Sequence, residues 1–467
     1  MLWRNRNFVR LWTGQAVSIV GDFVFDTTLT LWIGVVLLRG RTFAPAAVSG
    51  LLIVVAVVTM VVAPIAGVFV DRWDRRRTML VTDLVRAALV GGLTAVAFLP
   101  AGTLSNVTLV VLAYAVVACS TAAGQFFNPA RFAMIGAVVP AGPDRSRAGG
   151  IGQATNSIAA IVGPPLAAPL LFAVGVRWSL LINAASFLFS FLAVRAVRVE
   201  PAPDPAGGAR GGFRAEFLAG VRYVAANRVL RTVLIAVCVV TVGTGALNAL
   251  NVFFVTDNLH AAAHWYGTIG MAEGIGSVLG ALGAAAIAAR LGNARVFAVG
   301  LVVVGLGTIV YARMPALLAG LVVIVVLAVP LGALNSVLSP LVLDATPPRL
   351  VGRVISVLNP TQQVASLAGV AVAGWLASIV LLGFDADVAG VHLGRLDTIL
   401  LAAGLLVLIG GVYAMVALRG VDRAAQPPAA DADPSGPVVA AGTDPDGPHR
   451  EPGADPEPPV TARGSGC

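Results

Sequence analysis

The chain has 467 residues, of which 58% are apolar and only 12% carry a charge, and its formal net charge is +8. A water-soluble fold could not keep so much apolar surface away from water, so the composition indicates a protein embedded in a membrane. All 31 basic residues are arginine. Without lysine the chain can form neither a P-loop nucleotide site nor a Schiff base.

Twelve apolar stretches follow one another along the chain, and each is long enough to cross a bilayer, which takes about 20 residues. The first begins close to the N-terminus with no small-residue cleavage site, so we expect no cleavable signal peptide. We predict membrane spans at residues 11–38, 46–69, 78–99, 106–127, 148–174, 178–197, 230–255, 265–289, 294–312, 316–343, 353–383 and 398–418.

The spans divide six and six, which predicts an all-α membrane protein with two pseudo-symmetric six-helix bundles at residues 1–199 and 229–419. Residues 200–228 form a cytoplasmic linker that begins rich in proline and glycine. Its second part places apolar residues at helical spacing, so we expect an amphipathic helix on the inner membrane surface. Residues 420–467 contain few large apolar side chains, and we expect a disordered cytoplasmic tail.

The arginines are concentrated in every second loop, which is the positive-inside pattern of membrane proteins. Clusters occur near Arg4, at Arg72 to Arg77, and near Arg145. This distribution predicts that both termini are cytoplasmic and that the chain is a multi-pass protein of the cell inner membrane. The basic charge is therefore explained by topology and by contact with the lipid bilayer, and we expect no nucleic-acid partner.

Three acidic residues lie inside predicted spans, where a charge costs about 2.5–3.5 kcal/mol on insertion scales. Asp22 and Asp26 are four residues apart on one face of the first span, and Glu273 lies in a glycine-rich part of the eighth. Burial disfavours the charged form of a carboxyl group, so such groups can exchange protons. We predict that all three couple transport to protons. The alternatives are an ion pair of Asp22 with a buried arginine and a packing role for Glu273.

Several amide and aromatic side chains interrupt the apolar spans. They can bind bulky amphipathic molecules through hydrogen bonds and broad apolar contact, although each can equally form a hydrogen bond between helices. We predict a substrate cavity lined by Gln125, Phe126, Asn248, Asn251, Asn335, Asn359 and Gln362.

The turn after the second span resembles the signature of the major facilitator superfamily, Gly-x-x-x-Asp-Arg-x-Gly-Arg-Lys. Asp74 stands where the signature has its second glycine. A generic basic loop is the alternative, but the resemblance implies a conformational latch that opens and closes as the two bundles move, and we extend it to two charged residues of the next span. The predicted latch consists of Gly67, Asp71, Arg72, Arg75, Arg76, Asp83 and Arg86.

The residues from Arg4 to Gln15, followed by Gly21-Asp22, are similar to the start of a bacterial drug and siderophore efflux branch that includes macrolide exporters and the enterobactin exporter. Asn128-Pro129-Ala130-Arg131 also fits that branch. In the fifth span, Gly163 and Pro164 match the antiporter signature, whereas alanine replaces its other glycines. The resemblance covers about residues 4–420, and we expect Gly163 and Pro164 to serve helix packing.

The resemblance implies the major facilitator fold and a secondary active transporter that exports small amphipathic compounds in exchange for protons by alternating access. An importer or a lipid flippase of the same fold is the alternative, and a non-transporting scaffold or sensor is a rival from another class. No catalytic constellation is evident, so we expect no enzyme and no cofactor. His260 and His264 lack a third ligand, so we expect no metal. We expect a monomer whose partners are a small-molecule substrate, protons and the bilayer.

Overall fold

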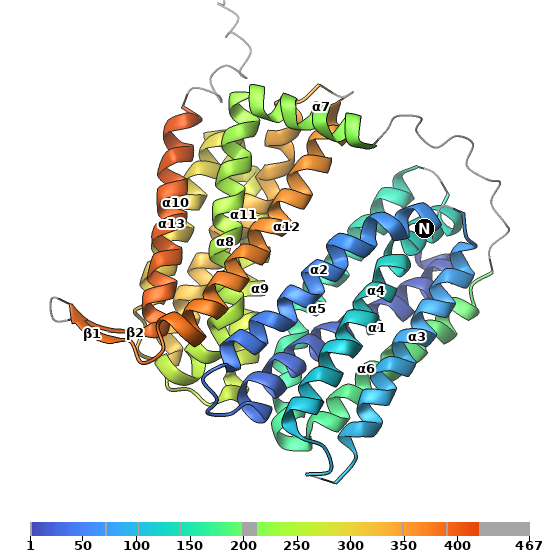
Figure 1. The fold of residues 1–467 in the computed structure, drawn as a ribbon. Coiled ribbons are helices and arrows are strands. Elements are labelled where there is room, and N and C mark those ends of the chain that lie inside the picture. The colour runs from blue at the N-terminus through green and yellow to red at the C-terminus, as the bar shows by residue number, and fades with distance from the viewer. Residues whose placement is uncertain are drawn as a thin grey trace, which may run out of the picture. The chain divides into compact units, whose positions relative to one another are not determined.

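The computed structural model describes residues 2–70, 72–100, 102–140, 142–198, 213–347, 350–388 and 391–419. The predicted tail at 420–467, most of the predicted linker and Asp71 therefore lie outside the described residues. Met1–Ala425 forms one compact unit. Within its described part, twelve helices are long and apolar enough to cross a membrane (Figure 1). The predicted all-α membrane fold is confirmed.

The N-terminal half contains six of these helices. Asn5, Asp74 and Ser105 cap α1, α3 and α4, because each side chain accepts hydrogen bonds from backbone N–H groups of the first turn. The predicted fourth span ends at 127, but α4 continues through Pro129, since membrane helices tolerate an interior proline. The helices are α1 (Arg6–Leu31), α2 (Ala44–Val70), α3 (Arg75–Ala97), α4 (Asn106–Val138), α5 (Pro143–Pro169) and α6 (Val176–Arg195).

The C-terminal half repeats this plan after the linker helix α7 (Phe213–Ala226). It also contains an antiparallel hairpin of β1 (Asp385–Val388) and β2 (Val391–Gly394), so the prediction missed two short strands. Its six spanning helices are α8 (Arg228–Phe253), α9 (Tyr266–Leu291), α10 (Asn293–Tyr311), α11 (Leu317–Asp344), α12 (Val351–Trp375) and α13 (Arg395–Ala417).

Helix α7 packs against α8 and α12 of the C-terminal half. Val224 is buried, and a Cβ atom added to Gly220 would overlap the backbone of Arg353 in α12. The hydroxyl of Tyr223 donates a hydrogen bond to the carbonyl of Ala345 at 3.3 Å. The described apolar side of this helix therefore contacts protein, where the sequence prediction placed it on the membrane surface.

Four spanning helices end in a short π-helical segment, in which the turns are wider than in an α-helix. The segments are Trp32–Leu37 after α1, Leu170–Val174 after α5, Phe254–Asn258 after α8 and Leu376–Val380 after α12. These helices are the first and fifth spans of each half. The two halves therefore share a local irregularity at equivalent positions, which agrees with an internally duplicated fold.

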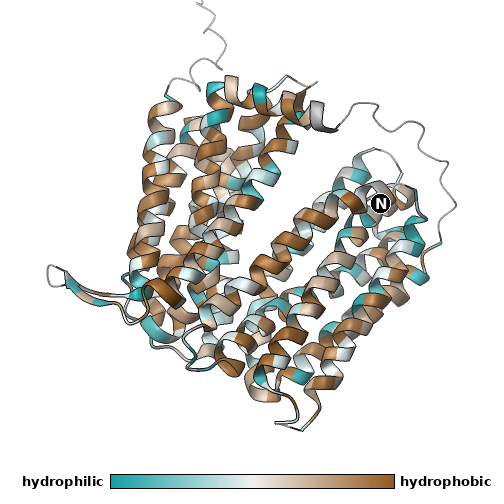
Figure 2. Cartoon of the chain, viewed as in Figure 1, coloured by the Kyte–Doolittle hydropathy of each residue, from teal (hydrophilic) through white to brown (hydrophobic). Residues whose placement is uncertain are grey.

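Apolar side chains cover both the interior and much of the outer surface of the helices, and the polar residues gather toward helix ends and loops (Figure 2). Leu282 and Leu318, for example, are each 75% exposed. Such exposure would be unfavourable in water and is expected for side chains that face lipid.

We call the end of the helices that carries Arg72, Arg75 and Arg76 the basic end, and the opposite end the far end. The backbone N–H of Ala46, in the first turn of α2, accepts no helical partner and instead donates a hydrogen bond to Ser378 Oγ at 2.9 Å. Ser49, one turn later, contacts Gly374 near the end of α12. Both contacts join the two halves at the far end.

A second contact between the halves joins α5 and α9. A Cβ atom added to Gly270 would lie 3.2 Å from Cβ of Pro164, and Gly274 packs equally closely against Ile161. Helix α9 starts at the far end and α5 ends there, so this contact also lies toward the far end. The glycines allow the backbones of the two helices to approach closely.

Candidate functional site

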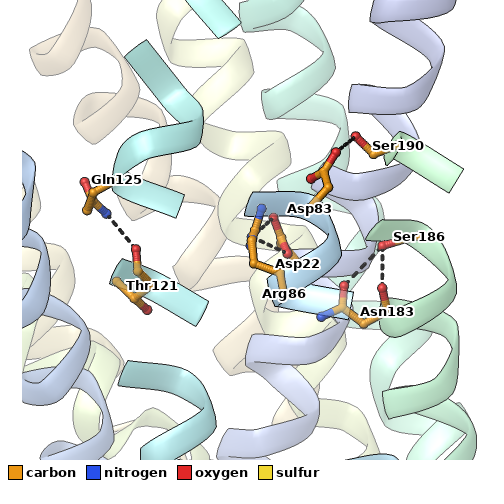
Figure 3. Close-up of polar contacts among 8 residues, drawn as sticks. All are labelled: Asp22, Asp83, Arg86, Thr121, Gln125, Asn183, Ser186 and Ser190. Atoms are coloured by element: carbon orange, nitrogen blue, oxygen red, sulfur yellow. Dashed lines mark hydrogen bonds and ion pairs between the residues drawn. The ribbon is translucent and has the colours of Figure 1, made fainter. Parts of the chain in front are cut away.

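The centre of the N-terminal half contains an ion pair between two membrane-spanning helices. Arg86 of α3 donates to both carboxylate oxygens of Asp22 in α1, at 3.0 and 3.1 Å (Figure 3). The guanidinium group also lies over the ring of Phe187 in α6, 4.0 Å from the ring centroid. This geometry realises the alternative in which Asp22 pairs with a buried arginine, and it places both groups where three helices meet.

Gly21 explains how the helix carrying Asp22 can approach α6. A Cβ atom at this position would lie 2.8 Å from Oδ1 of Asn183 and would overlap the side chain of Ser186. Any larger residue would therefore separate α1 from α6. The glycine fixes the depth of Asp22 within the bundle.

Asp83 lies one helical turn from Arg86 on α3 and is completely buried. Ser190 of α6 donates a hydrogen bond to its Oδ2 atom at 2.7 Å (Figure 3), whereas Oδ1 has no hydrogen-bond partner among the described residues. The sequence prediction assigned Asp83 and Arg86 to the latch at the basic turn. Their observed partners are instead Ser190 and Asp22, in the bundle interior.

Asp26 lies one turn beyond Asp22 along α1, and its side chain is exposed. No described residue forms a hydrogen bond or an ion pair with its carboxylate. Asp22 and Arg86 are its charged neighbours. The N-terminal half therefore holds three carboxyl groups, at positions 22, 26 and 83, around one arginine.

Glu273 lies in α9 of the C-terminal half and is partly buried. Tyr266 and Tyr311 lie within electrostatic range of its carboxyl group. The nearby Gly270 and Gly274 face α5, so Glu273 lies on the helix that joins the two halves. It is not part of the charged group around Arg86.

The described residues of the basic turn have separate partners. An added Cβ atom at Gly67 meets nothing within 4 Å, so the close helix approach expected at this glycine is absent here. Asp74, the departure from the signature, caps α3 by accepting from the N–H of Arg77 at 2.6 Å. Arg76 donates to the carbonyl of Arg195 at 2.6 Å and so ties α3 to the end of α6. Arg72 and Arg75 lie at the start of the same region, and Asp71 lies outside the described residues.

The predicted cavity residues do not form one group. Asn251 is buried inside the C-terminal half, where its Oδ1 accepts a hydrogen bond from Tyr311 at 2.7 Å, so its side chain holds helices together rather than lining a cavity. Gln125 donates to Thr59 of α2 at 3.3 Å and to the backbone within α4 (Figure 3). Phe126 stacks on Trp73, with ring centroids 5.8 Å apart. The exposed amides are Asn248, Asn335 and Asn359, and Gln362 is partly buried.

The antiporter-like segment lies between two helices. Gly163 packs against Phe23 of α1, and Pro164 contacts Gly267 and Gly270 of α9. This short stretch of α5 therefore contacts both its own half and the other half.

The sequence prediction missed the polar face of α6. Ser179, Asn183, Ser186 and Ser190 are all buried, and they recur at intervals of three or four residues. This is the signal of a polar stripe in an apolar helix. It would have placed α6 beside the acidic residues of α1 and α3.

The profile of the Major Facilitator Superfamily matches residues 11–254 and again residues 233–445. Together these two regions cover most of the chain, one for each six-helix half. The chain belongs to this superfamily. Its members are membrane transporters rather than enzymes, and the protein is accordingly a multi-pass transporter of a small-molecule substrate. The predicted family is confirmed.

Similar members of the superfamily include the multidrug efflux pump Tap of Mycobacterium tuberculosis, which is 29% identical over 367 residues, or 78% of this chain and 83% of Tap. The uncharacterized transporter YkuC of Bacillus subtilis is 24% identical over 433 residues, or 89% of this chain and 93% of YkuC.

Solved structures share the fold at low sequence identity. The nucleoside transporter NupG superposes with a TM-score of 0.68 at 14% identity, covering 88% of this chain and 99% of NupG. A bacterial homologue of the lysosomal transporter Spinster gives a TM-score of 0.64 at 15% identity, covering 90% of this chain and 99% of that structure.

Proposed function

We propose that this protein exports small amphipathic compounds, drugs or secreted metabolites, and that protons move inward in exchange. Export is supported by the similarity to Tap, a multidrug efflux pump, over most of both chains. The observation that carries proton coupling is the unpaired carboxylate of Asp26 beside the Asp22–Arg86 ion pair.

Charge balance explains why this group suits proton exchange. Arg86 neutralises one carboxylate, but Asp22, Asp26 and Asp83 lie around it. Surplus negative charge inside a membrane protein is unfavourable unless a proton or a cation neutralises it. A proton, or a basic group on a substrate, supplies that neutralisation at Asp26. Proton and substrate then compete for one position, which is what an exchanger requires.

Alternating access is supported by where the two halves touch. The described contacts of α2 with α12 and of α5 with α9 lie toward the far end. We infer that both termini and the basic end are cytoplasmic, following the arginine distribution, and that the protein lies in the inner membrane. The described conformation is then closed on the outside. Opening the outer side would break the contact between Ala46 and Ser378.

In this account the basic turn is a latch that forms when the cytoplasmic side closes. Gly67 has open space around it in the present conformation, so a neighbouring helix can approach it in the other one. Glu273 lies on the α9 contact with α5, and a charge change there would alter how the halves pack. We assign it a secondary role in coupling.

The test is transport by purified protein in liposomes with an imposed pH gradient, using a panel of amphipathic dyes and drugs. Asp26→Asn should abolish proton-driven accumulation but leave substrate binding measurable. Asp344→Asn is the matched control, because Asp344 is an exposed carboxylate at the end of α11. Unchanged proton-driven transport in Asp26→Asn would refute the coupling role, and a pH gradient that drives no compound in the wild type would refute proton-coupled export.

A further inference from the structure

A cavity of about 560 Å³ lies within the N-terminal half, in the space between α1, α4 and α5. Its volume falls in the range of about 300–1,000 Å³ that is usual for small-molecule sites. Helices α1 and α5 pack closely, whereas α4 makes few contacts with either of them. Gly136, Gly149 and Gly152 line the cavity, and an added Cβ atom at any of them meets nothing within 4 Å. Their missing side chains keep the cavity open.

Two polar side chains in the cavity wall lack partners. Gln15 is only 6% exposed, and neither its amide nitrogen nor its amide oxygen has a hydrogen-bond partner among the described residues. Arg131 has a buried Nε atom without a partner, and its one described contact is with the ring of Phe132, 5.0 Å from the centroid. Buried amides and guanidinium groups are nearly always hydrogen-bonded in native proteins. Both groups therefore point to a ligand that would satisfy them.

The charge of the cavity selects the ligand's sign. The described lining contains two arginines, Arg131 and Arg145, and no carboxylate. Arg145 is already engaged, because it donates to the carbonyls of Gly136 at 2.7 Å and Val139 at 3.2 Å. Arg131 retains its hydrogen-bonding capacity for an anion. A carboxylate or phosphate is the natural partner of a guanidinium group.

The rest of the wall is apolar and aromatic. Trp12 is held in place by a hydrogen bond from its ring nitrogen to Thr155 at 2.9 Å, and Phe8, Ile19 and Phe132 lie around the same space. Such a wall accommodates an apolar body next to the charged group.

This cavity is connected to the charged group through α1. Trp12, Gln15, Ile19, Asp22 and Asp26 are spaced three or four residues apart and so follow one face of the helix. Seven residues separate Gln15 from Asp22, which is about 10 Å along the helix axis. The cavity is therefore a separate site below the carboxylates, and the two sites share one rigid element.

We propose that this cavity binds amphiphiles that carry one acidic group, a carboxylate or a phosphate, attached to an apolar body. The acidic group pairs with Arg131 and accepts a hydrogen bond from the Gln15 amide, and the apolar body packs against Trp12 and Phe132. The proposal goes beyond proton-coupled export, because it concerns binding and does not depend on the role of Asp26.

The test uses the full chain in phosphatidylcholine nanodiscs and the quenching of tryptophan fluorescence by 11-bromoundecanoic acid. The neutral 11-bromoundecanol is the matched ligand. We expect saturable quenching by the acid with an affinity at least about tenfold above that of the alcohol, which is the difference expected for one charge-assisted contact. Trp12→Phe should lose the saturable component, which assigns it to this cavity.

Arg131→Gln should remove the preference for the acid. Arg177→Gln is the matched control, because Arg177 also stacks on a phenylalanine ring, that of Phe98 at 5.3 Å, but does not line this cavity. Gln15→Leu removes the amide at similar size and should weaken acid binding even if Arg131→Gln folds poorly. Gly152→Leu should weaken acid and alcohol alike by filling the cavity.

Adding phosphatidylglycerol to the nanodiscs separates two sources of the ligand. Displacement of the bromo acid by this lipid identifies an anionic headgroup as the occupant, whereas unchanged binding identifies a free amphiphile; either supports an acid-selective site. Equal affinity for acid and alcohol in the wild type, or an acid preference that persists in both Arg131→Gln and Gln15→Leu, would overturn the proposal.

Discussion

The two halves of this transporter share a helical plan but use different chemistry in their interiors. In the N-terminal half, α1, α3 and α6 surround the Asp22–Arg86 ion pair and the buried Asp83. In the C-terminal half, the described ion pairs Arg313–Asp397 and Arg395–Asp257 lie at the far end, at 3.7 and 3.3 Å. Its interior is joined by close backbone contacts at glycines, such as Gly280 against Val329 and Gly369 against Val242.

This contrast suggests a division of labour within a duplicated fold. A half with charged groups between its helices can respond to protonation, because each charge change alters the contacts among three helices. A half joined through glycine backbones is rigid, since no side chain can rearrange at those contacts. The charged half and the rigid half can then move relative to each other at the contacts of α5 with α9. Four substitutions test this contrast.

The largest effect is expected in the glycine-packed half. Gly280→Val places a side chain against the carbonyl of Val329 and within 3.0 Å of the backbone nitrogen of Ala333, and should lower the free energy of unfolding by about 3 kcal/mol or more. Gly283→Val, on the same helix, is the control, because its Cβ meets only Ile287 at 3.8 Å. Thermal denaturation in detergent measures both. Equal destabilisation would mean that close backbone packing does not stabilise this half.

The next effect is expected at the charged group. Arg86→Gln leaves the carboxylate of Asp22 without its cation and should cost about 2–3 kcal/mol, at the low end for a buried pair because the Asp22 side chain retains 34% exposure. Asp22→Asn combined with Arg86→Gln should recover part of that stability without recovering proton-driven transport. A double variant no more stable than Arg86→Gln would show that the two residues are not energetically coupled.

A smaller effect is expected at the neighbouring buried carboxyl group. Ser190→Ala removes the described hydrogen bond to Asp83 and should cost about 1–2 kcal/mol, because a buried polar group loses its partner. Ser186→Ala is the control on the same helix, since the hydroxyl of Ser186 bonds only to Asn183 within α6. Denaturation in mixed detergent, followed by circular dichroism, compares the two. A larger loss in Ser186→Ala would contradict the ranking.

The smallest effect is expected at the far end of the C-terminal half. Arg395→Gln breaks the pair with Asp257, whose side chains are 29% and 46% exposed, and should cost less than about 1 kcal/mol. Added salt should reduce the difference from wild type further. Destabilisation equal to that of Arg86→Gln would remove the contrast between the halves.

Most of the fold could be predicted from the sequence, because hydropathy is a strong signal when every span must be apolar. The second span, predicted at 46–69, is Ala44–Val70, and the twelfth, predicted at 398–418, is Arg395–Ala417. The errors occur where local sequence signals compete. Pro129 suggested the end of α4, but neighbouring helices tolerate a proline that would break an isolated helix.

The site could be predicted only in part. An intramembrane charge marks Asp22, Asp26 and Glu273 from composition alone, but periodicity cannot tell which helices become neighbours. Arg86 follows the basic turn in sequence and was grouped with it, whereas packing of α3 on α6 turns it toward α1. The unpartnered Gln15 could not be recognised either, because a lack of partners is a property of the packed structure.

The π-helical segments after α1, α5, α8 and α12 have a mechanical consequence. A π turn holds one residue more than an α turn of the same hydrogen-bonded ring, so each of these four ends stores a residue of slack. Tightening one segment into α-helix would rotate the adjoining chain by about 100°, the angle of one helical residue. Each half could thus re-aim its outermost side chains like a screw advanced by one thread, without unfolding a span.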